Sequence, residues 1–230
     1  MAFIKTIAPA MAQGEILEMY ERQEAAWGYV PNYAKAFSGR PEVLARWGRL
    51  LAEIKRPMSK RRFELVTFAA ALELRNTACS LAHGRALLEF FTAEEVLKMR
   101  ENKFSESATE TEKAIFRFAR KIVKDASLVT SGDVDLLKKH GLNDDEIFDI
   151  AATAAGRAFF TKLLDALGVE TDSTFLEMDS AFRRAMTVGR PIGYRPVERL
   201  PETPGEAGSR SPRAGNGRRA DYQSVDLSNH

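Results

Sequence analysis

The stretch ELVTFAAALELRNTACSLAH, residues 64–83, decides the fold class of this chain. Its first half is a nearly unbroken apolar run, which favours a buried helix. Asn76 and Thr77 interrupt the run, and both residue types are good N-caps, so a second helix is expected to begin at one of them. The stretch therefore predicts two consecutive helices, with Glu64 and Phe68 on the face of the first that packs against the second.

Helical patterns continue on both sides of this stretch. Apolar residues recur at three and four positions near residues 14–26, 41–55, 60–75 and 77–90, with prolines as breaks. Capping boxes predict further helix starts: Thr92 with Glu95, Thr109 with Glu112, Asn143 with Glu146 and, more weakly, Thr130 with Asp133. Gly141 and Gly168 stand where helix C-caps are expected. Because no segment shows β-alternation, the sequence predicts an all-α fold.

The helical pattern covers most of the chain and then stops. A length of 230 residues with 44% hydrophobic content can supply one sizeable core. The pattern ends near Gly189, and from Pro201 onward Pro, Gly, Ser and Arg dominate. Such a composition lacks the apolar residues that would offset the entropy of ordering. We therefore expect one helical domain at 1–196 and a disordered tail at 197–230.

The charge pattern gives no argument for nucleic-acid or membrane partners. The formal net charge is +2, and no segment approaches a membrane-spanning length of apolar residues. A basic run at 55–56 and 60–62 lacks interleaved aromatics and is expected to be a solvated helix start with an acidic partner. A single cysteine excludes an intramolecular disulfide, and the acidic N-terminal segment does not resemble a signal peptide. A soluble, cytoplasmic protein is expected.

Cys79 is the only cysteine, and two residues with acid-base chemistry stand at suggestive spacing around it. In the first turn of the expected helix, backbone amides and the helix dipole favour a thiolate. His83 lies four residues further on, so its imidazole shares a helix face with the thiol. Glu64, on the preceding helix, can orient that imidazole. Each residue alone is more often structural, but their joint spacing predicts a reactive centre.

The same stretch resembles the core motif of the alkylhydroperoxidase D family, within the carboxymuconolactone decarboxylase-like superfamily. That motif runs Glu-x11-Cys-x2-Cys-x3-His, and Glu64, Cys79 and His83 match its acid, its second cysteine and its histidine. The similarity extends to GYVPNYAKAFSGRPEVL upstream and KHGLNDDEIFDIA downstream, and covers roughly residues 20–190. The peroxidase-related members with an N-terminal extension are most similar in appearance. The resemblance implies an alkylhydroperoxidase D-like helical domain that assembles as a homo-oligomer, a trimer or a hexamer.

The sequence departs from the motif at its first cysteine, where Asn76 stands, and Ala78 precedes the second. In the family's peroxidase cycle, peroxide attacks the second cysteine and the first then resolves the sulfenic acid as a disulfide. That resolving step is impossible within this chain. The resemblance then implies a one-cysteine, peroxidase-like oxidoreductase in which Cys79 is the nucleophile, His83 and Glu64 form a proton relay, and an external thiol is the reductant.

Two alternatives stay open. One is a non-redox acid-base enzyme of the decarboxylase type, which would act on a small carboxylated lactone through His83 and Glu64; the presence of Cys79 argues against it. The other is a non-catalytic family member, in which Asn76 is simply a helix N-cap.

Neither a cofactor nor a metal is expected. No nicotinamide, flavin or haem motif is present, and His140 and His230 lie far from His83 in the sequence. Trp27 and Trp47 are assigned to the core or to an interface. The expected partners are a small-molecule peroxide or lactone, the external thiol and other copies of the chain.

Overall fold

The computed structural model describes residues 2–193. Its α-helices are α1 (Gly14–Trp27), α2 (Asn32–Ala36), α3 (Pro41–Lys55), α4 (Lys60–Glu73), α5 (Thr77–Leu87), α6 (Ala93–Arg100), α7 (Glu110–Asp125), α8 (Ser131–Lys139), α9 (Asp144–Ala166) and α10 (Ser180–Met186). Short 3₁₀ turns occupy Pro9–Met11, Ala126–Leu128 and Ser173–Glu177, and one isolated parallel β-bridge joins Thr171 to Ile192. The predicted all-α class is confirmed. The predicted tail at 197–230 lies outside the described residues, as do His230 and the proposed domain end at residue 196.

The predicted helix starts are confirmed by their caps. Helices α6, α7 and α9 each begin with a complete capping box at the expected pair of residues. At the start of α8, the Asp133 carboxylate accepts the Thr130 N–H at 2.8 Å, but the Thr130 side chain accepts no backbone hydrogen bond from the described residues. In α7, for example, the Glu112 N–H donates to Thr109 Oγ1 at 3.1 Å, and the Glu112 carboxylate accepts the Thr109 N–H at 2.9 Å. Gly141 and Gly168 follow α8 and α9 with φ of 87° and 68°, a left-handed conformation that favours glycine. Helices α2 and α10 were not predicted, because five and seven residues are too few to show a period.

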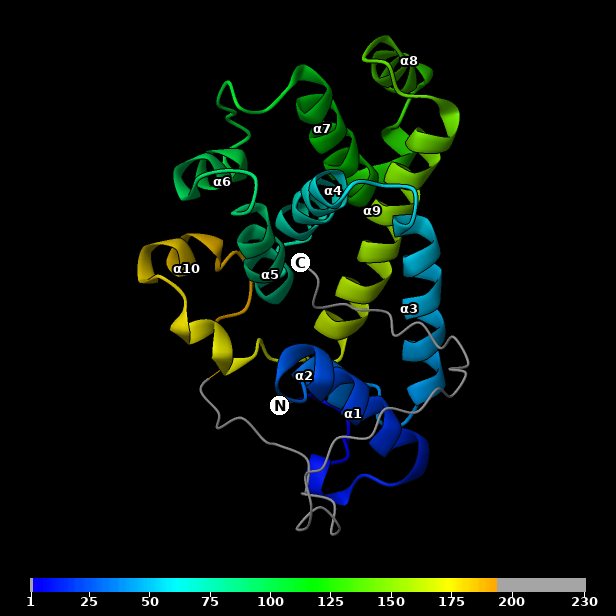
Figure 1. Cartoon of the computed structure of the whole chain (residues 1–230), viewed down its shortest axis with the longest axis vertical. Coiled ribbons are helices and arrows are strands. Elements are labelled where there is room, and N and C mark those ends of the chain that lie inside the picture. Colours follow the sequence, from blue (N-terminus) through cyan, green and yellow to red (C-terminus); the bar gives the residue numbers. More distant parts are fainter. Residues whose placement is uncertain (1, 194–230) are drawn as a thin grey trace, which may run out of the picture.

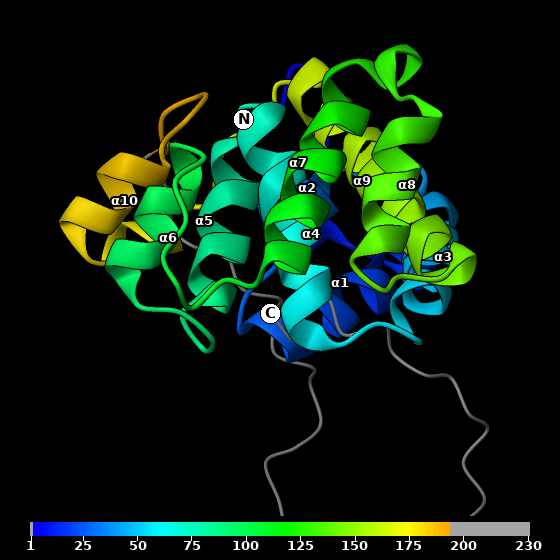
Figure 2. The ribbon, with the colours of Figure 1, turned by 90° about the horizontal axis from the view of Figure 1, so that it is seen from above.

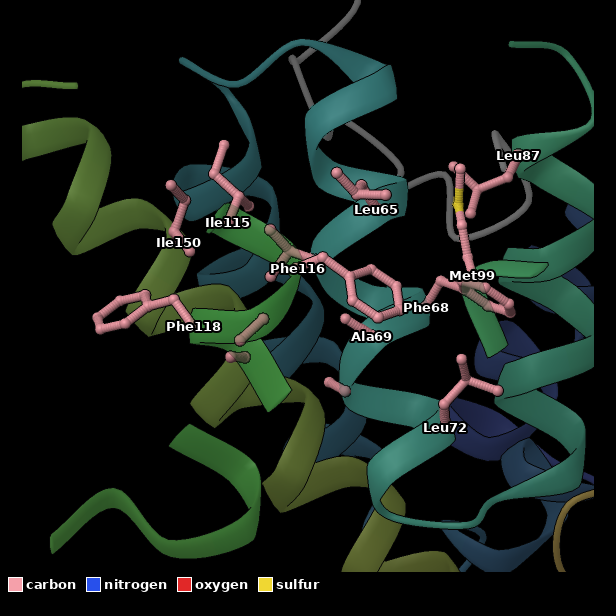
Figure 3. Packing of buried hydrophobic residues seen from close by; sticks show 14 of the residues in the cluster. Leu65, Phe68, Ala69, Leu72, Leu87, Met99, Ile115, Phe116, Phe118 and Ile150 are labelled. Atoms are coloured by element: carbon pink, nitrogen blue, oxygen red, sulfur yellow. The ribbon is translucent and has the colours of Figure 1, made fainter. Parts of the chain in front are cut away.

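Helix α4 is the centre of the molecule. It packs against α5 on one side and against α7 and α9 on the other, and these helices surround it in both views (Figures 1 and 2). Residues 63–72 of α4 are all buried, so this helix has no solvent-facing stripe along most of its length. Figure 3 shows Phe68 of α4 beside Phe116 of α7, with ring centroids 6.4 Å apart. Truncating a phenylalanine buried in this way costs about 3–5 kcal/mol.

The apolar interior divides into two clusters that meet at α4. The larger cluster contains Phe68 and Phe116 and lies among α4 to α9. The smaller one joins α1 to α3 to the C-terminal half of α9, and its members include Trp47, Phe63 and Phe160. Because Phe63 and Phe68 both come from α4, that helix holds the two clusters together.

The basic start of α4 finds its acidic partners within the chain. Lys60 pairs with Glu89 at 2.7 Å, Arg61 with Glu112 at 2.5 Å, and Arg62 with Glu146 at 2.7 Å. The last two glutamates are those of the capping boxes of α7 and α9. The basic run therefore fastens the N-terminal end of α4 to its two neighbours, and these pairs account for the acidic partner expected from the sequence.

The segment after α10 crosses the turn between α4 and α5. Ser80 Oγ donates to the Met186 carbonyl at 2.5 Å, and the Gly189 N–H donates to Thr77 Oγ1 at 3.0 Å. Arg75, in the turn itself, has a left-handed φ of 56°, and a Cβ built on Gly189 would lie 1.8 Å from the Arg75 carbonyl oxygen. Only glycine fits at position 189 without moving that turn.

Within residues 2–193, none of the helices is both long enough and apolar enough to cross a lipid bilayer.

Candidate functional site

Glu64 and His83 form a buried pair between α4 and α5. Their side chains are 0% and 2% exposed, and Glu64 Oε2 lies 2.8 Å from His83 Nδ1. When Glu64 is ionised its carboxylate can only accept a hydrogen bond, so Nδ1 then donates, and the contact orients the ring. Burial of either group alone would be costly, and the pairing explains how an acid can occupy the apolar interior of α4.

Cys79 lies in the first turn of α5, as the sequence predicted. Its side chain is 6% exposed, and its backbone N–H donates to Asn76 Oδ1 at 2.9 Å. Its Sγ is 3.7 Å from Thr161 Oγ1 of α9. His83 follows one helical turn later and lines the same cavity as Cys79. The structure therefore places Cys79 and His83 on one cavity, with Glu64 in contact with His83.

Asn76 occupies the N-cap of α5 and is held from both sides. Its Oδ1 accepts the Cys79 N–H, and its Nδ2 donates to Asp165 Oδ1 of α9 at 3.0 Å. Burial raises the pKa of Asp165, and this hydrogen bond partly opposes the rise. Asn76, at the position of the motif's first cysteine, thus caps α5, the helix that carries Cys79.

A cavity of about 70 Å³ lies beside Cys79 and His83. Aromatic side chains supply much of its wall: Trp27, Tyr29, Tyr33, Trp47, Phe160 and Phe175. Trp47 and Phe160 are stacked, with centroids 4.4 Å apart, and Tyr33 meets Phe160 edge-on at 5.4 Å. The sequence assigned Trp27 and Trp47 to the core or an interface, and the structure places both on this cavity. No local pattern could have indicated that, because α1 and α3 reach the cavity only through tertiary packing.

Asp172 is an acidic group of the cavity that sequence analysis missed. Burial raises its pKa to about 6, opposed by the Asn32 backbone N–H, which donates to Oδ1 at 2.8 Å, and by the Tyr29 side chain. Burial and the nearby Asp172 charge raise the pKa of Tyr29. Asp172 therefore holds its proton more tightly than an ordinary carboxyl group does.

Arg157 is a second missed residue. It is 4% exposed and lines the cavity from α9, with its guanidinium carbon 5.9 Å from the Trp47 ring centroid and 5.8 Å from that of Phe160. The signal available in the sequence was a single arginine among the apolar and small residues of the 144–166 helix, a position where a charge is uncommon.

Within residues 2–193, no group of three or more His, Cys, Asp or Glu side chains is arranged to hold a metal ion. The polar groups on the cavity are instead those of acid-base and thiol chemistry.

The overall architecture matches that of known structures. The AhpD core of an uncharacterised peroxidase-related protein from Ralstonia eutropha JMP134 superposes with a TM-score of 0.66 at 20% identity, over 82% of this chain and 98% of that one. This chain has the alkylhydroperoxidase D fold. The fold inferred from the motif at 64–83 is therefore confirmed.

Further structures share the alkylhydroperoxidase D fold with this chain. A peroxidase-related protein from Silicibacter sp. TM1040 gives a TM-score of 0.61 at 19% identity, over 76% of this chain and 98% of that one. The debrominase Bmp8 also gives 0.61, at 15% identity, over 75% of this chain and 91% of that one. A cysteine-to-alanine variant of Bmp8 was solved with 2,3,4-tribromopyrrole. No protein-family model and no curated protein matches this sequence.

Proposed function

We propose that this chain is a one-cysteine member of the alkylhydroperoxidase D-like superfamily and acts as a thiol-dependent peroxidase. The observation that carries the proposal is the buried Glu64–His83 pair, because its His83 lies one helical turn from Cys79 and lines the same cavity. Structural neighbours described as peroxidase-related support it. A fold hosts many chemistries, so the argument rests on the site.

The first step is oxidation of Cys79. His83, oriented by Glu64 through Nδ1, takes the thiol proton, and the thiolate attacks one peroxide oxygen. The O–O bond breaks, the departing oxygen leaves as an alcohol or water after receiving that proton, and Cys79 becomes a sulfenic acid. A relay of this kind contributes about 10²–10⁴-fold to the rate.

The second step requires a thiol from outside, because the chain has no other cysteine. A small thiol condenses with the sulfenic acid, which releases water and leaves a mixed disulfide on Cys79. A second thiol molecule then displaces Cys79, regenerates the enzyme and departs as a disulfide of the two small molecules. The cycle balances one peroxide against two thiols.

Peroxide titration followed by intact mass tests this proposal. We expect one oxygen atom to be gained per chain, trapped by a sulfenic-acid reagent, and removed when a small thiol is added. The Cys79→Ser protein should gain none. In His83→Gln, which can still donate to Glu64, oxidation should slow by about 10²-fold or more, whereas His140→Gln, a matched change in α8, should leave the rate unaltered. A Cys79 that resists peroxide in the folded protein overturns the proposal.

A non-redox acid-base enzyme of the decarboxylase type is the second candidate. It is favoured by Asn76, which stands in place of the motif's first cysteine while the Glu64–His83 pair is complete. Such an enzyme would turn over a small carboxylated lactone with full rate in the Cys79→Ser protein. Absence of lactone turnover in the parent protein eliminates this candidate.

We also propose a homo-oligomeric assembly, in line with the trimers and hexamers that the family resemblance implies. Light scattering of the full chain measures the order directly, and a monomer at micromolar concentration contradicts it.

A further inference from the structure

Arg157 is a buried cation with hydrogen-bond donors that no described residue satisfies. Its side chain is 4% exposed, and its Nε and Nη2 are buried with no hydrogen-bond partner among the described residues. An arginine stays charged at all physiological pH values, so it cannot avoid the penalty by losing a proton. Buried charges in proteins are normally paired, because an unpaired one is expensive to remove from water.

The neighbouring aromatic rings compensate for only part of this penalty. The guanidinium lies within 6 Å of the centroids of Trp47 and Phe160, a cation-π geometry. Ring faces attract the charge but do not accept the directed hydrogen bonds that Nε and Nη2 offer. What the site lacks is an oxygen acceptor in the plane of the guanidinium, the position that a carboxylate occupies in a two-pronged pair.

The acids on this cavity have partners of their own. Asp165 accepts from Asn76 Nδ2, and Asp172 accepts from the Asn32 N–H. Glu170 also takes part in an interaction. The second cation of the cavity, Arg190, lies over the ring of Phe3. The acceptor for Arg157 is therefore expected from a bound molecule.

The position of Arg157 on α9 relates that molecule to the thiol. Arg157, Thr161 and Asp165 are four residues apart and share one helix face, about 5–6 Å from one to the next. Thr161 Oγ1 is the atom 3.7 Å from Cys79 Sγ. An anionic group held at Arg157 thus lies about one helical turn from the thiol, with aromatic walls around the rest of the molecule.

We propose that this cavity binds a small aromatic carboxylate, with the carboxylate on the guanidinium of Arg157 and the ring against the aromatic walls. The inference goes beyond the peroxidase proposal, because binding needs neither oxidation of Cys79 nor a reductant.

The test is a titration of the full-length Cys79→Ser protein with benzoate and with benzamide. Benzamide has the same shape as benzoate and carries no charge. Calorimetry gives the affinities, and tryptophan fluorescence follows Trp27 and Trp47 on the cavity wall. We expect benzoate to bind at least ~10-fold more tightly than benzamide, because a charge-assisted pair is stronger than a neutral hydrogen bond.

Two arginine variants distinguish a direct contact between benzoate and Arg157 from a general attraction of benzoate to the positive charges of the cavity. Arg157→Met, which keeps the volume but not the charge, should lower benzoate affinity to that of benzamide. Arg190→Met removes a cation from the same cavity and should change benzoate affinity by less than ~3-fold, since a charge that makes no direct contact acts only through a screened field. Should Arg157→Met fail to fold, the ratio of benzoate to benzamide in the parent decides the matter.

Three results overturn the inference: equal affinity for benzoate and benzamide, equal losses in the two arginine variants, or no benzoate binding up to ~10 mM, where affinity is no better than that of a non-specific contact. Each is independent of the thiol. Selective benzoate binding beside an inert Cys79 defeats only the peroxidase proposal, and the reverse pattern defeats only the ligand class.

Discussion

The two walls of the cavity differ in how completely their polar groups are paired. On the α5 wall, the Asn76 side chain is engaged on both sides, and His83 Nδ1 meets the carboxylate of Glu64. On the opposite wall, Arg157 of α9 leaves two N–H groups without an acceptor among the described residues, and burial raises the pKa of Asp172 to about 6. Its hydrogen bonds hold the first wall in place around Cys79. On the second wall, Arg157 keeps two donors for which we propose a bound carboxylate as the acceptor.

Breaking the paired wall should have the largest effect. Glu64→Leu leaves the His83 Nδ1–H buried without its carboxylate, and we expect a loss of about 3–5 kcal/mol in the free energy of unfolding. The double variant Glu64→Leu/His83→Leu replaces both partners by apolar groups and should recover much of that loss. Urea unfolding of the two single variants and the double variant gives the coupling energy. Losses that simply add would show that the pair is not a unit.

Asp172 should make stability depend on pH. Its pKa is raised to about 6 in the folded protein, so the native state holds the proton more tightly than the unfolded chain does. Its contribution to stability therefore falls as pH rises from about 4 to about 6. Asp172→Asn should gain about 1–2 kcal/mol relative to the parent on going from pH 4 to pH 7.5, less than the full shift implies because the side chain is partly exposed.

Urea unfolding of both proteins at the two pH values measures this difference directly. A constant difference between Asp172→Asn and the parent across the range contradicts the assignment of a raised pKa to this carboxyl.

Restoring the missing cysteine should change the product of oxidation. Residues 76 and 79 span the first turn of α5, where Cα atoms three apart are within the range that a disulfide requires. Peroxide-treated Asn76→Cys should lose two hydrogens by intact mass, where the parent gains an oxygen. It should also be less stable by about 1 kcal/mol, because the N-cap is lost. Asn76→Ser keeps a capping oxygen without a thiol and should still stop at the sulfenic acid, so an oxygen adduct on both variants excludes resolution by residue 76.

The unpaired wall should tolerate loss of its cation. In Arg157→Met, loss of the cation-π contacts with Trp47 and Phe160 is offset by removal of an unsatisfied buried charge. We expect the free energy of unfolding to change by less than about 1 kcal/mol, in contrast to Glu64→Leu. A loss as large as that of the Glu64 variant would mean that Arg157 supports the fold.

Local features of the fold could be predicted from the sequence, and the cavity could not. Thr109 with Glu112 fixes the start of α7 through contacts three residues apart, so one pattern carries the whole signal. Cys79 and His83 are also local, at one helical turn. Glu64 lies on the preceding helix, and its spacing to Cys79 and His83, together with the motif resemblance, was needed to connect it to them.

Arg157 and Asp172 belong to the other class. Each has an ordinary local context, and only the tertiary fold distinguishes it. Arg157 lies beside the rings of Trp47 and Phe160, and Asp172 accepts the N–H of Asn32 at the start of α2. Trp47 was assigned to the core or an interface for the same reason. Its place in the apolar repeat of α3 indicates that it is buried but not which residues surround it.

The close approach of Gly189 to Arg75 has an evolutionary consequence. The turn before α5 and the segment after α10 occupy the same small space, with 1.8 Å between the Arg75 carbonyl oxygen and the Cβ that any other residue at 189 would bring. In related sequences, position 189 should therefore remain glycine, or should change together with the length or conformation of the turn at 74–76. The segment after α10 and the turn that leads into the Cys79 helix are therefore expected to change together.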